Sequence, residues 1–326
     1  MGMRKIKNIR TAERGRSEIV MIGKEENVAF PTKNLIIKND YDEFELFVSE
    51  YFTRFADVIA TSELCKGNSG NAKKQLYANI RKLNRKHYFD KYDKIIVFDN
   101  MTAVIALLAT IRHKDRIILW FWNIMRFSPK DYLKLKLIKY FCAAWTFDFA
   151  DAKKYRINLN TQFYPLIACS DISEATTDLF FVGLNKGRKP LLDCIEKVCQ
   201  YSNIRCSFVV VGEKKSDGSI QQPINYSQVL DHIKHTKAIL EICQEGQTGL
   251  TVRAMEAIYF NRKLITNNDT IYSKKYFNEN NTLIIDESNY DKIADFLQQP
   301  FYGFPDEARK YYSIESWLER FDTKSE

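Results

Sequence analysis

Apolar runs of strand length alternate with stretches of helical periodicity along most of the chain. This alternation is typical of βαβ units and predicts an α/β protein built on parallel sheets. In the first half, the pattern predicts strands at 18–23, 34–39, 94–100, 116–123 and 143–149. The helical stretches of the same half lie at 41–60, 69–88, 102–114 and 128–142.

The alternation resumes in the second half, after polar and turn residues at 158–177 interrupt it. Here the pattern predicts strands at 178–183, 205–212, 238–243, 263–268 and 282–286 and helices at 187–202, 226–236, 249–260 and 289–298. We therefore expect two Rossmann-like domains facing each other across a cleft, the first over 1–165 and the second over 166–305. The remaining segment, 306–326, is helical in pattern and is a candidate for packing back on the first domain.

The composition of the chain bears on the cellular compartment in which the protein is expected. No apolar run approaches the roughly 20 residues that a membrane-spanning helix requires, and the basic N-terminus lacks the apolar segment of a secretory signal. The seven cysteines include no Cys-x-x-Cys pair, which favours reduced thiols over disulfides or a zinc site. These features predict a cytoplasmic protein.

Charge is distributed unevenly between the two halves. Residues 1–165 hold 30 Lys and Arg against 18 Asp and Glu, whereas the rest of the chain is slightly acidic. The excess is densest from Lys66 to Lys94, where it indicates either a solvated helix face or an anionic partner such as a phospholipid surface, a pyrophosphate-linked substrate or nucleic acid. The predicted helix at 129–141 mixes four lysines with apolar residues, a composition that suits core packing or shallow insertion into an anionic leaflet.

Two loops in the second half follow predicted strands and carry phosphate-binding chemistry. In "FFVGLNKGRK", a glycine allows close backbone approach, and Lys186 and Arg188 supply cations for phosphate oxygens. The alternative is a basic turn that opens a surface helix. In "QEGQTGLTVRAMEA", Thr248 and Gly249 precede a predicted helix whose first N–H groups form an anion site.

The same predicted helix carries two charges in its first turns. Arg253 is unfavourably placed against the helix dipole unless an anion compensates for it. Glu256 lies three residues further, on the same face, where a carboxylate can accept hydrogen bonds from ribose hydroxyls. The alternative is a surface Arg–Glu pair of about 0.2–0.5 kcal/mol, which leaves the loop of small residues unexplained.

Together these segments, with "AILEIC" before the second loop, resemble the nucleotide-sugar half of GT-B glycosyltransferases. More closely, they are similar to bacterial proteins of lipopolysaccharide or capsular polysaccharide biosynthesis. The resemblance covers most of residues 178–286 and extends more loosely into the first half. It implies that Glu256 binds ribose, that Thr248, Gly249 and Thr251 bind diphosphate near Arg253, Lys186 and Arg188, and that Gly212 and Glu213 lie near the base. The chain departs from the common bacterial pattern of two glutamates with seven residues between them, because ten separate Glu245 from Glu256.

Glycosyl transfer requires stabilisation of the departing diphosphate and a base for the attacking hydroxyl. A helix N-terminus with Lys and Arg meets the first need without a metal, so we expect no metal and no cofactor. For the base, the first domain offers Asp99 and Asp148, with Asp151, His87 and His113 as rivals. Asp99 has an equally good alternative role as a helix cap.

Acceptor binding is expected in the first domain. Trp122 and Asn123 end a predicted strand there, and aromatic faces and amides suit sugar rings, although a tryptophan at a domain interface equally serves packing. The expected partners are a nucleotide-sugar donor, a saccharide or lipid-linked saccharide acceptor, and peripheral contact with the anionic inner membrane, without nucleic acid. The alternatives are a nucleic-acid-binding protein that uses the basic first half, and a sugar-nucleotide epimerase or a non-catalytic binding subunit of the same fold.

Overall fold

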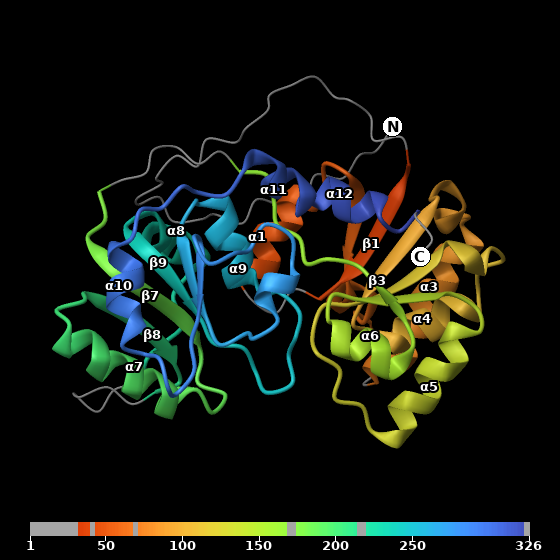
Figure 1. Cartoon of the computed structure of the whole chain (residues 1–326). Coiled ribbons are helices and arrows are strands. Elements are labelled where there is room, and N and C mark those ends of the chain that lie inside the picture. The colour runs from red at the N-terminus through yellow and green to blue at the C-terminus, as the bar shows by residue number, and fades with distance from the viewer. Residues whose placement is uncertain (1–31, 40–42, 68–70, 168–173, 214–219, 323–326) are drawn as a thin grey trace.

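The structure is a computed structural model that describes residues 32–39, 43–67, 71–167, 174–213 and 220–322. It contains two parallel sheets, of six and five strands, each flanked by helices in its own lobe (Figure 1). The strand expected at 18–23 lies outside the described residues. The α/β prediction of two Rossmann-like domains is confirmed.

The first sheet has the order β2-β1-β3-β4-β5-β6, and all of its pairings are parallel. Its central strands are buried along their whole length, as apolar runs between two layers of helices should be. The strands are β1 (Asn34–Lys38), β2 (Ala56–Ala60), β3 (Lys94–Phe98), β4 (Ile117–Phe121), β5 (Ala143–Thr146) and β6 (Asn158–Leu159).

Helices join these strands in the first domain. They are α1 (Glu43–Phe52), α2 (Thr61–Leu64), α3 (Ala72–Arg85), α4 (Met101–Leu108), α5 (Pro129–Lys139) and α6 (Phe149–Tyr155). The single helix expected at 41–60 is wrong, because α1 ends at Phe52 and β2 follows. Val58 and Ile59 are β-branched, and β2 pairs in register with β1, so a tertiary contact decides the strand. The strand expected at 143–149 ends earlier, because Asp148 caps α6.

The second sheet has the order β11-β10-β9-β7-β8 and is also parallel. Its strands are β7 (Thr177–Leu184), β8 (Cys206–Val211), β9 (Thr236–Glu241), β10 (Lys263–Thr266) and β11 (Thr282–Ile284). Its helices are α7 (Lys189–Tyr201), α8 (Tyr226–Lys234), α9 (Val252–Tyr259) and α10 (Lys292–Gln298). Each lies where the apolar periodicity placed it, within a few residues at either end.

The C-terminal segment crosses from the second lobe to the first (Figure 1). It forms two helices, α11 (Asp306–Tyr311) and α12 (Ile314–Glu319), rather than one. Trp317 of α12 is completely buried, and its ring lies 5.4 Å from that of Trp120 in β4 and 6.0 Å from that of Phe52 in α1. The end of the chain therefore completes the core of the first domain.

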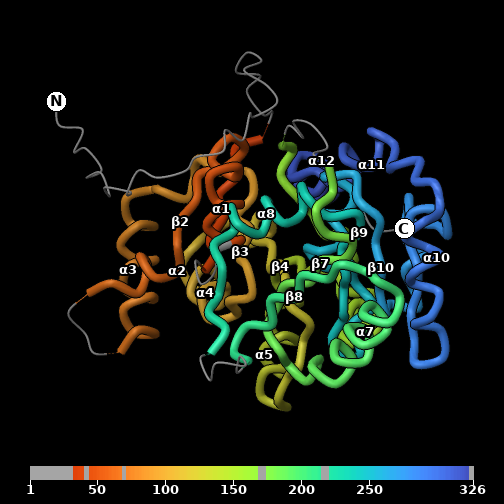
Figure 2. The backbone as a smooth tube through the Cα atoms, turned by 90° about the vertical axis from the view of Figure 1, so that its left-hand side faces the viewer, coloured from red at the N-terminus to blue at the C-terminus, as the bar shows by residue number. Residues whose placement is uncertain are grey.

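Helix α1 belongs to the first domain in sequence but packs against α8 of the second (Figures 1 and 2). The rings of Phe44 and Phe47 lie 5.2 and 4.7 Å from that of Tyr226. Tyr164, in the segment between the sheets, joins this cluster through a 2.6 Å hydrogen bond between its hydroxyl and that of Tyr226. Apolar packing thus continues from one domain into the other and fixes the walls of the space between them.

Candidate active site

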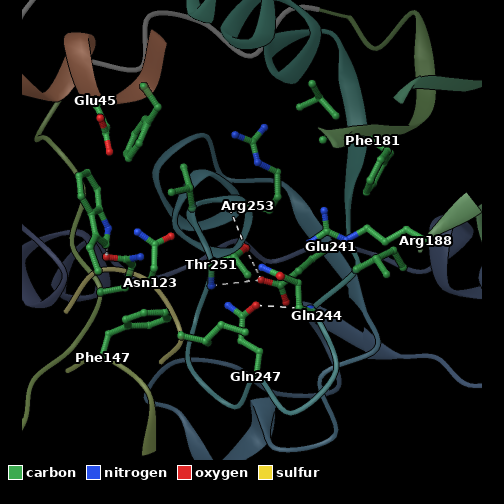
Figure 3. A pocket seen from close by; sticks show the side chains of 18 residues that line it. Glu45, Asn123, Phe147, Phe181, Arg188, Glu241, Gln244, Gln247, Thr251 and Arg253 are labelled. Atoms are coloured by element: carbon green, nitrogen blue, oxygen red, sulfur yellow. Dashed lines mark hydrogen bonds between the residues drawn. The ribbon is translucent and has the colours of Figure 1, made fainter. Parts of the chain in front are cut away.

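A cleft of about 330 Å³ lies between the two domains at the carboxyl ends of β4, β7 and β9. In Figure 3, Glu45 and Asn123 lie on one side, Arg188 and Glu241 on the other, and Arg253 between them. The first domain contributes Phe44, Glu45, Trp122, Asn123, Ile124, Phe147 and Gln162. The second contributes Phe181, Val182, Gly183, Arg188, Glu241, Ile242, Gln244, Gln247, Thr251, Val252 and Arg253. This is the position at which parallel α/β sheets bind ligands.

The loop that enters α9 is tied to the end of β9. The Thr251 hydroxyl donates to Glu241 Oε1 at 2.5 Å and accepts a hydrogen bond from Arg253 N, so Thr251 caps the helix. The other carboxylate oxygen of Glu241 accepts from the Thr266 hydroxyl, also at 2.5 Å. Burial raises the pKa of Glu241, and the hydrogen bonds from Thr251 and Thr266 oppose the shift. Glu241 therefore holds the cleft wall in place.

Arg253 points into the cleft from the first turn of α9, and 17% of its side chain is exposed (Figure 3). Its Nη2 atom lies 2.8 Å from Glu256 Oε1, which also accepts a hydrogen bond from the Tyr226 hydroxyl at 2.7 Å. Among the described residues, the Nη1 atom of Arg253 has no hydrogen-bond acceptor. Arg253 is thus held from behind by Glu256, while part of its side chain faces the cleft.

Glu256, for which a ribose contact is expected, does not reach the cleft in this structure. The side chain of Glu256 is completely buried behind Arg253 and does not line the cleft. Burial raises its pKa to about 7, while the charge of Arg253 and the hydrogen bond from Tyr226 oppose the shift. Because Glu256 lies one turn after Arg253, its role in this structure is to position that guanidinium.

Arg188 reaches the cleft from the turn between β7 and α7. Its Nη1 atom donates to the Leu184 carbonyl at 3.1 Å, and among the described residues its Nε atom has no acceptor. A Cβ on Gly183 would lie 3.4 Å from Arg188 Nη1 and 3.3 Å from the Phe181 ring, so a glycine leaves room for the arginine at the strand end. Burial lowers the pKa of the Arg188 guanidinium, and the nearby Cys243 and Glu241 oppose this shift.

Three further residues of the expected donor site do not line the cleft. Lys186 is exposed in the turn before Arg188. Glu213 accepts a hydrogen bond from Asn185 and faces a separate hollow beside α7, and Gly212 precedes it at φ 86°. Lys186, Gly212 and Glu213 thus follow the ends of β7 and β8 without lining the cleft.

Asp148 joins the two domains. Its Oδ2 atom accepts hydrogen bonds from the backbone N–H groups of Thr248 and Gly249, both at 2.7 Å, and its Oδ1 atom accepts from the Thr248 hydroxyl at 3.1 Å and from Asp151 N at 3.0 Å. Asp148 is 1% exposed, so in this structure its carboxylate serves the domain contact, and a role as a catalytic base stays a prediction. In this structure the Asp148 carboxylate occupies the donors of Thr248 and Gly249, and their diphosphate contacts stay a prediction.

The contact between Asp148 and the loop of Thr248 and Gly249 leaves no room for a side chain at position 249. It also divides the space between the domains into two hollows. A Cβ on Gly249 would lie 2.5 Å from the ring of Phe147 and 2.9 Å from its carbonyl oxygen. A second hollow of about 860 Å³ lies on the far side, and Phe147 and Gln162 line both spaces. Its other walls include Phe149, Leu159 and Lys274.

Asp99 lies beneath the cleft instead of in it. Its Oδ1 atom accepts from Trp122 N at 3.0 Å and its Oδ2 atom from Asn123 Nδ2 at 2.9 Å. Burial raises the pKa of Asp99 to about 6, and both hydrogen bonds oppose the shift. In this structure Oδ1 therefore holds the backbone of Trp122 and Oδ2 orients Asn123, and a role of Asp99 as a catalytic base stays a prediction. Trp122 and Asn123 line the cleft as expected, with the Trp122 indole donating to Gln162.

Sequence reasoning missed Glu45 and Glu241. Glu45 lies in the first turn of α1, shortly after β1 ends, and this position after a strand was the available signal. It was hidden by the wrong expectation of one long helix over 41–60. Glu241 directly follows the apolar residues Ala238, Ile239 and Leu240 at the end of its strand and is completely buried, which is unusual for a glutamate.

The donors for a metal ion are few in the described part of the chain. No group of three or more His, Cys, Asp or Glu side chains there is placed to hold one. The sequence contains an Asp-x-Asp tripeptide at 40–42, between β1 and α1, and it lies outside the described residues.

Comparison with known proteins identifies the architecture. No protein-family model and no curated protein matches the chain. Among solved structures, the chain is similar to a glycosyltransferase from Rickettsia africae, with a TM-score of 0.54 and 10% identity over 89% of this chain and 96% of that one. HepE from Anabaena in complex with UDP matches with a TM-score of 0.48 and 10% identity, over 81% of this chain and 88% of that one. With its two facing Rossmann-like domains and the cleft between them, the chain has the GT-B fold.

Proposed function

We propose that this protein is a glycosyltransferase that moves a sugar from a nucleotide-sugar donor to a saccharide acceptor. The observation that carries the proposal is the cleft itself, which places Arg188 and Arg253 opposite Glu45 at the carboxyl ends of both sheets. Arg188 lines the cleft from the turn after β7, and Arg253 lines it from the first turn of α9. An anionic ligand on one wall and a hydroxyl acceptor on the other fit this arrangement. The fold shared with a glycosyltransferase agrees with it.

The two arginines serve the leaving group. Departure of a nucleoside diphosphate from an anomeric carbon develops negative charge on the phosphate oxygens, and fixed cations stabilise that charge more in the transition state than in the ground state. Arg253 is held by Glu256 and Arg188 by the Leu184 carbonyl, so neither needs to reorganise during the reaction. The bidentate geometry of guanidinium suits phosphate oxygens.

Glu45 is the proposed general base. Its carboxylate faces the cleft from the first domain, on the side of Asn123 and away from Arg188 (Figure 3). It would accept the proton of the attacking acceptor hydroxyl while the bond between the sugar and the diphosphate breaks. Asn123, oriented by Asp99, and the face of Trp122 would bind the acceptor sugar.

The finer assignments extend this proposal. We propose a metal-independent hexosyl transfer, because the two arginines supply the positive charge that a metal ion would otherwise provide. A role in bacterial surface polysaccharide biosynthesis, at the cytoplasmic side of the inner membrane and with a lipid-linked acceptor, is supported by the resemblance of the second-domain loops described above.

A donor screen tests the proposal. UDP, GDP, ADP and CMP, free and sugar-linked, are compared for their effect on the melting temperature of the protein. The affinity of the most stabilising ligand is then measured by calorimetric titration. We expect Arg253→Gln and Arg188→Gln each to weaken its binding by at least about tenfold, since each removes one charged hydrogen-bonding partner. Lys186→Gln removes a cation next to Arg188 that does not line the cleft and is the matched control. Stabilisation by none of the nucleotides, or an equal loss in the control, would refute this donor site.

A further inference from the structure

Helix α5 has two apolar faces, and only one of them is covered. Leu135 and Ile138 are buried against the first domain. On the opposite side, Leu133, Leu137 and Tyr140 are 69%, 57% and 84% exposed. Their spacing of four and three residues places them in one stripe along the helix. Such a stripe of large apolar side chains facing solvent calls for a partner.

Cations surround this stripe. Lys130, Lys134 and Lys136 line the same shallow hollow as Leu133, Leu137 and Tyr140. Lys134 pairs with Asp131 at 2.8 Å, and Lys136 lies over the ring of Tyr132, whereas Lys139 turns inward to the Tyr155 carbonyl. The face therefore presents apolar groups in its centre and positive charge at its edges.

We propose that the outer face of α5 docks on an anionic phospholipid bilayer, with Leu133, Leu137 and Tyr140 inserted at the level of the headgroups. Interfacial helices combine these two features, since buried apolar area and attraction to anionic lipids add. A second copy of the chain is the less suitable occupant, because symmetric pairing would bring the lysines of both copies together. Among the described residues, no helix is long and apolar enough to cross a membrane, so the contact is a surface one.

The position of α5 agrees with this assignment. The helix lies at the outer edge of the first domain in both views (Figures 1 and 2). It begins six residues after Asn123, so the segment that leaves the cleft leads directly into the docking face. The first half of the sequence also carries the excess of positive charge. A bilayer at α5 would therefore lie next to the domain for which we propose acceptor binding.

Flotation of the full chain with vesicles tests the proposal without reference to catalysis. We expect binding to vesicles of phosphatidylcholine with phosphatidylglycerol, weaker binding to phosphatidylcholine alone, and loss of the difference at high salt. Leu133→Ser with Leu137→Ser should lower the affinity by at least about tenfold. Lys130→Gln with Lys136→Gln should lower it by about fivefold per lysine.

Two control variants remove an exposed aromatic side chain or a pair of exposed lysines elsewhere on the surface. Tyr201→Ser removes a 90% exposed aromatic side chain from α7, and Lys73→Gln with Lys74→Gln removes two exposed lysines from α3. Both should bind vesicles as the wild type does. No vesicle binding by the wild type, full binding by the leucine variant, or an equal loss in the controls would overturn the proposal. So would a wild-type dimer that the leucine variant converts to a monomer in sedimentation velocity without vesicles.

Discussion

Replacing Asp148 with asparagine should weaken the contact between the domains. The carboxylate accepts two 2.7 Å hydrogen bonds from backbone N–H groups of the α9 loop, in addition to the Thr248 hydroxyl and the cap of α6. Asparagine has one acceptor oxygen, so it can replace Oδ1 or Oδ2 but not both. The hydrogen bonds of the other oxygen are lost, and those that remain no longer involve a charged group. A hydrogen bond to a charged group contributes about 1.5–3 kcal/mol, and loss of a helix cap costs about 0.5–2 kcal/mol.

We therefore expect Asp148→Asn to lower the free energy of unfolding by about 2–4 kcal/mol, or the melting temperature by about 4–8 °C. Guanidinium chloride unfolding and differential scanning calorimetry measure the two quantities. Asp115→Asn makes the same chemical change at an exposed position and should alter stability by less than about 0.5 kcal/mol. A loss as small as this in Asp148→Asn would refute the assignment of Asp148 to the domain contact.

The same variant decides between two locations for the donor diphosphate. If the N–H groups of Thr248 and Gly249 were the phosphate site, weakening their bond to Asp148 would free them and tighten nucleotide binding. We place the diphosphate at Arg188 and Arg253 and expect no such gain. Calorimetric titration of the preferred nucleoside diphosphate measures this, and a tightening of roughly tenfold or more would refute our location.

Three further predictions concern catalysis and pH. Glu45→Gln should lower kcat by at least about 100-fold with little change in donor affinity, whereas Glu50→Gln, an exposed glutamate on the same helix, should leave both unchanged; transfer assays with labelled donor measure this, and near-normal turnover would exclude Glu45 as the base. Transfer should persist in EDTA, and loss of activity that Mg²⁺ or Mn²⁺ restores would contradict metal independence. The pKa of Asp99 in the folded protein is about 6, above the ordinary value of 3.8. The contribution of Asp99 to stability is therefore complete below pH 3.8 and is lost as the pH rises through 6. The stability of wild type relative to Asp99→Asn should therefore fall by up to about 3 kcal/mol between roughly pH 4 and pH 7, and a pH-independent difference would contradict the burial of this carboxyl.

The sequence by itself determined the alternation of strands and helices, and with it the two parallel sheets. Buried parallel strands require continuous apolar runs, so β1, β3, β4, β7 and β9 are visible as such in the sequence. Because parallel sheets bind ligands at their carboxyl ends, the sequence also placed Trp122, Asn123, Arg188, Thr251 and Arg253 near a site, and all five line the cleft.

Only the tertiary structure decided what each polar group in that region contacts. Periodicity places Glu256 on the same side of α9 as Arg253, but the packing of α8 brings Tyr226 onto its carboxylate and leaves only the longer arginine at the cleft. The N–H groups of Thr248 and Gly249 before α9 donate to the carboxylate of Asp148, about 100 residues earlier in the chain. Such contacts depend on how distant helices and the two domains pack against each other, and a local pattern contains no information about that packing.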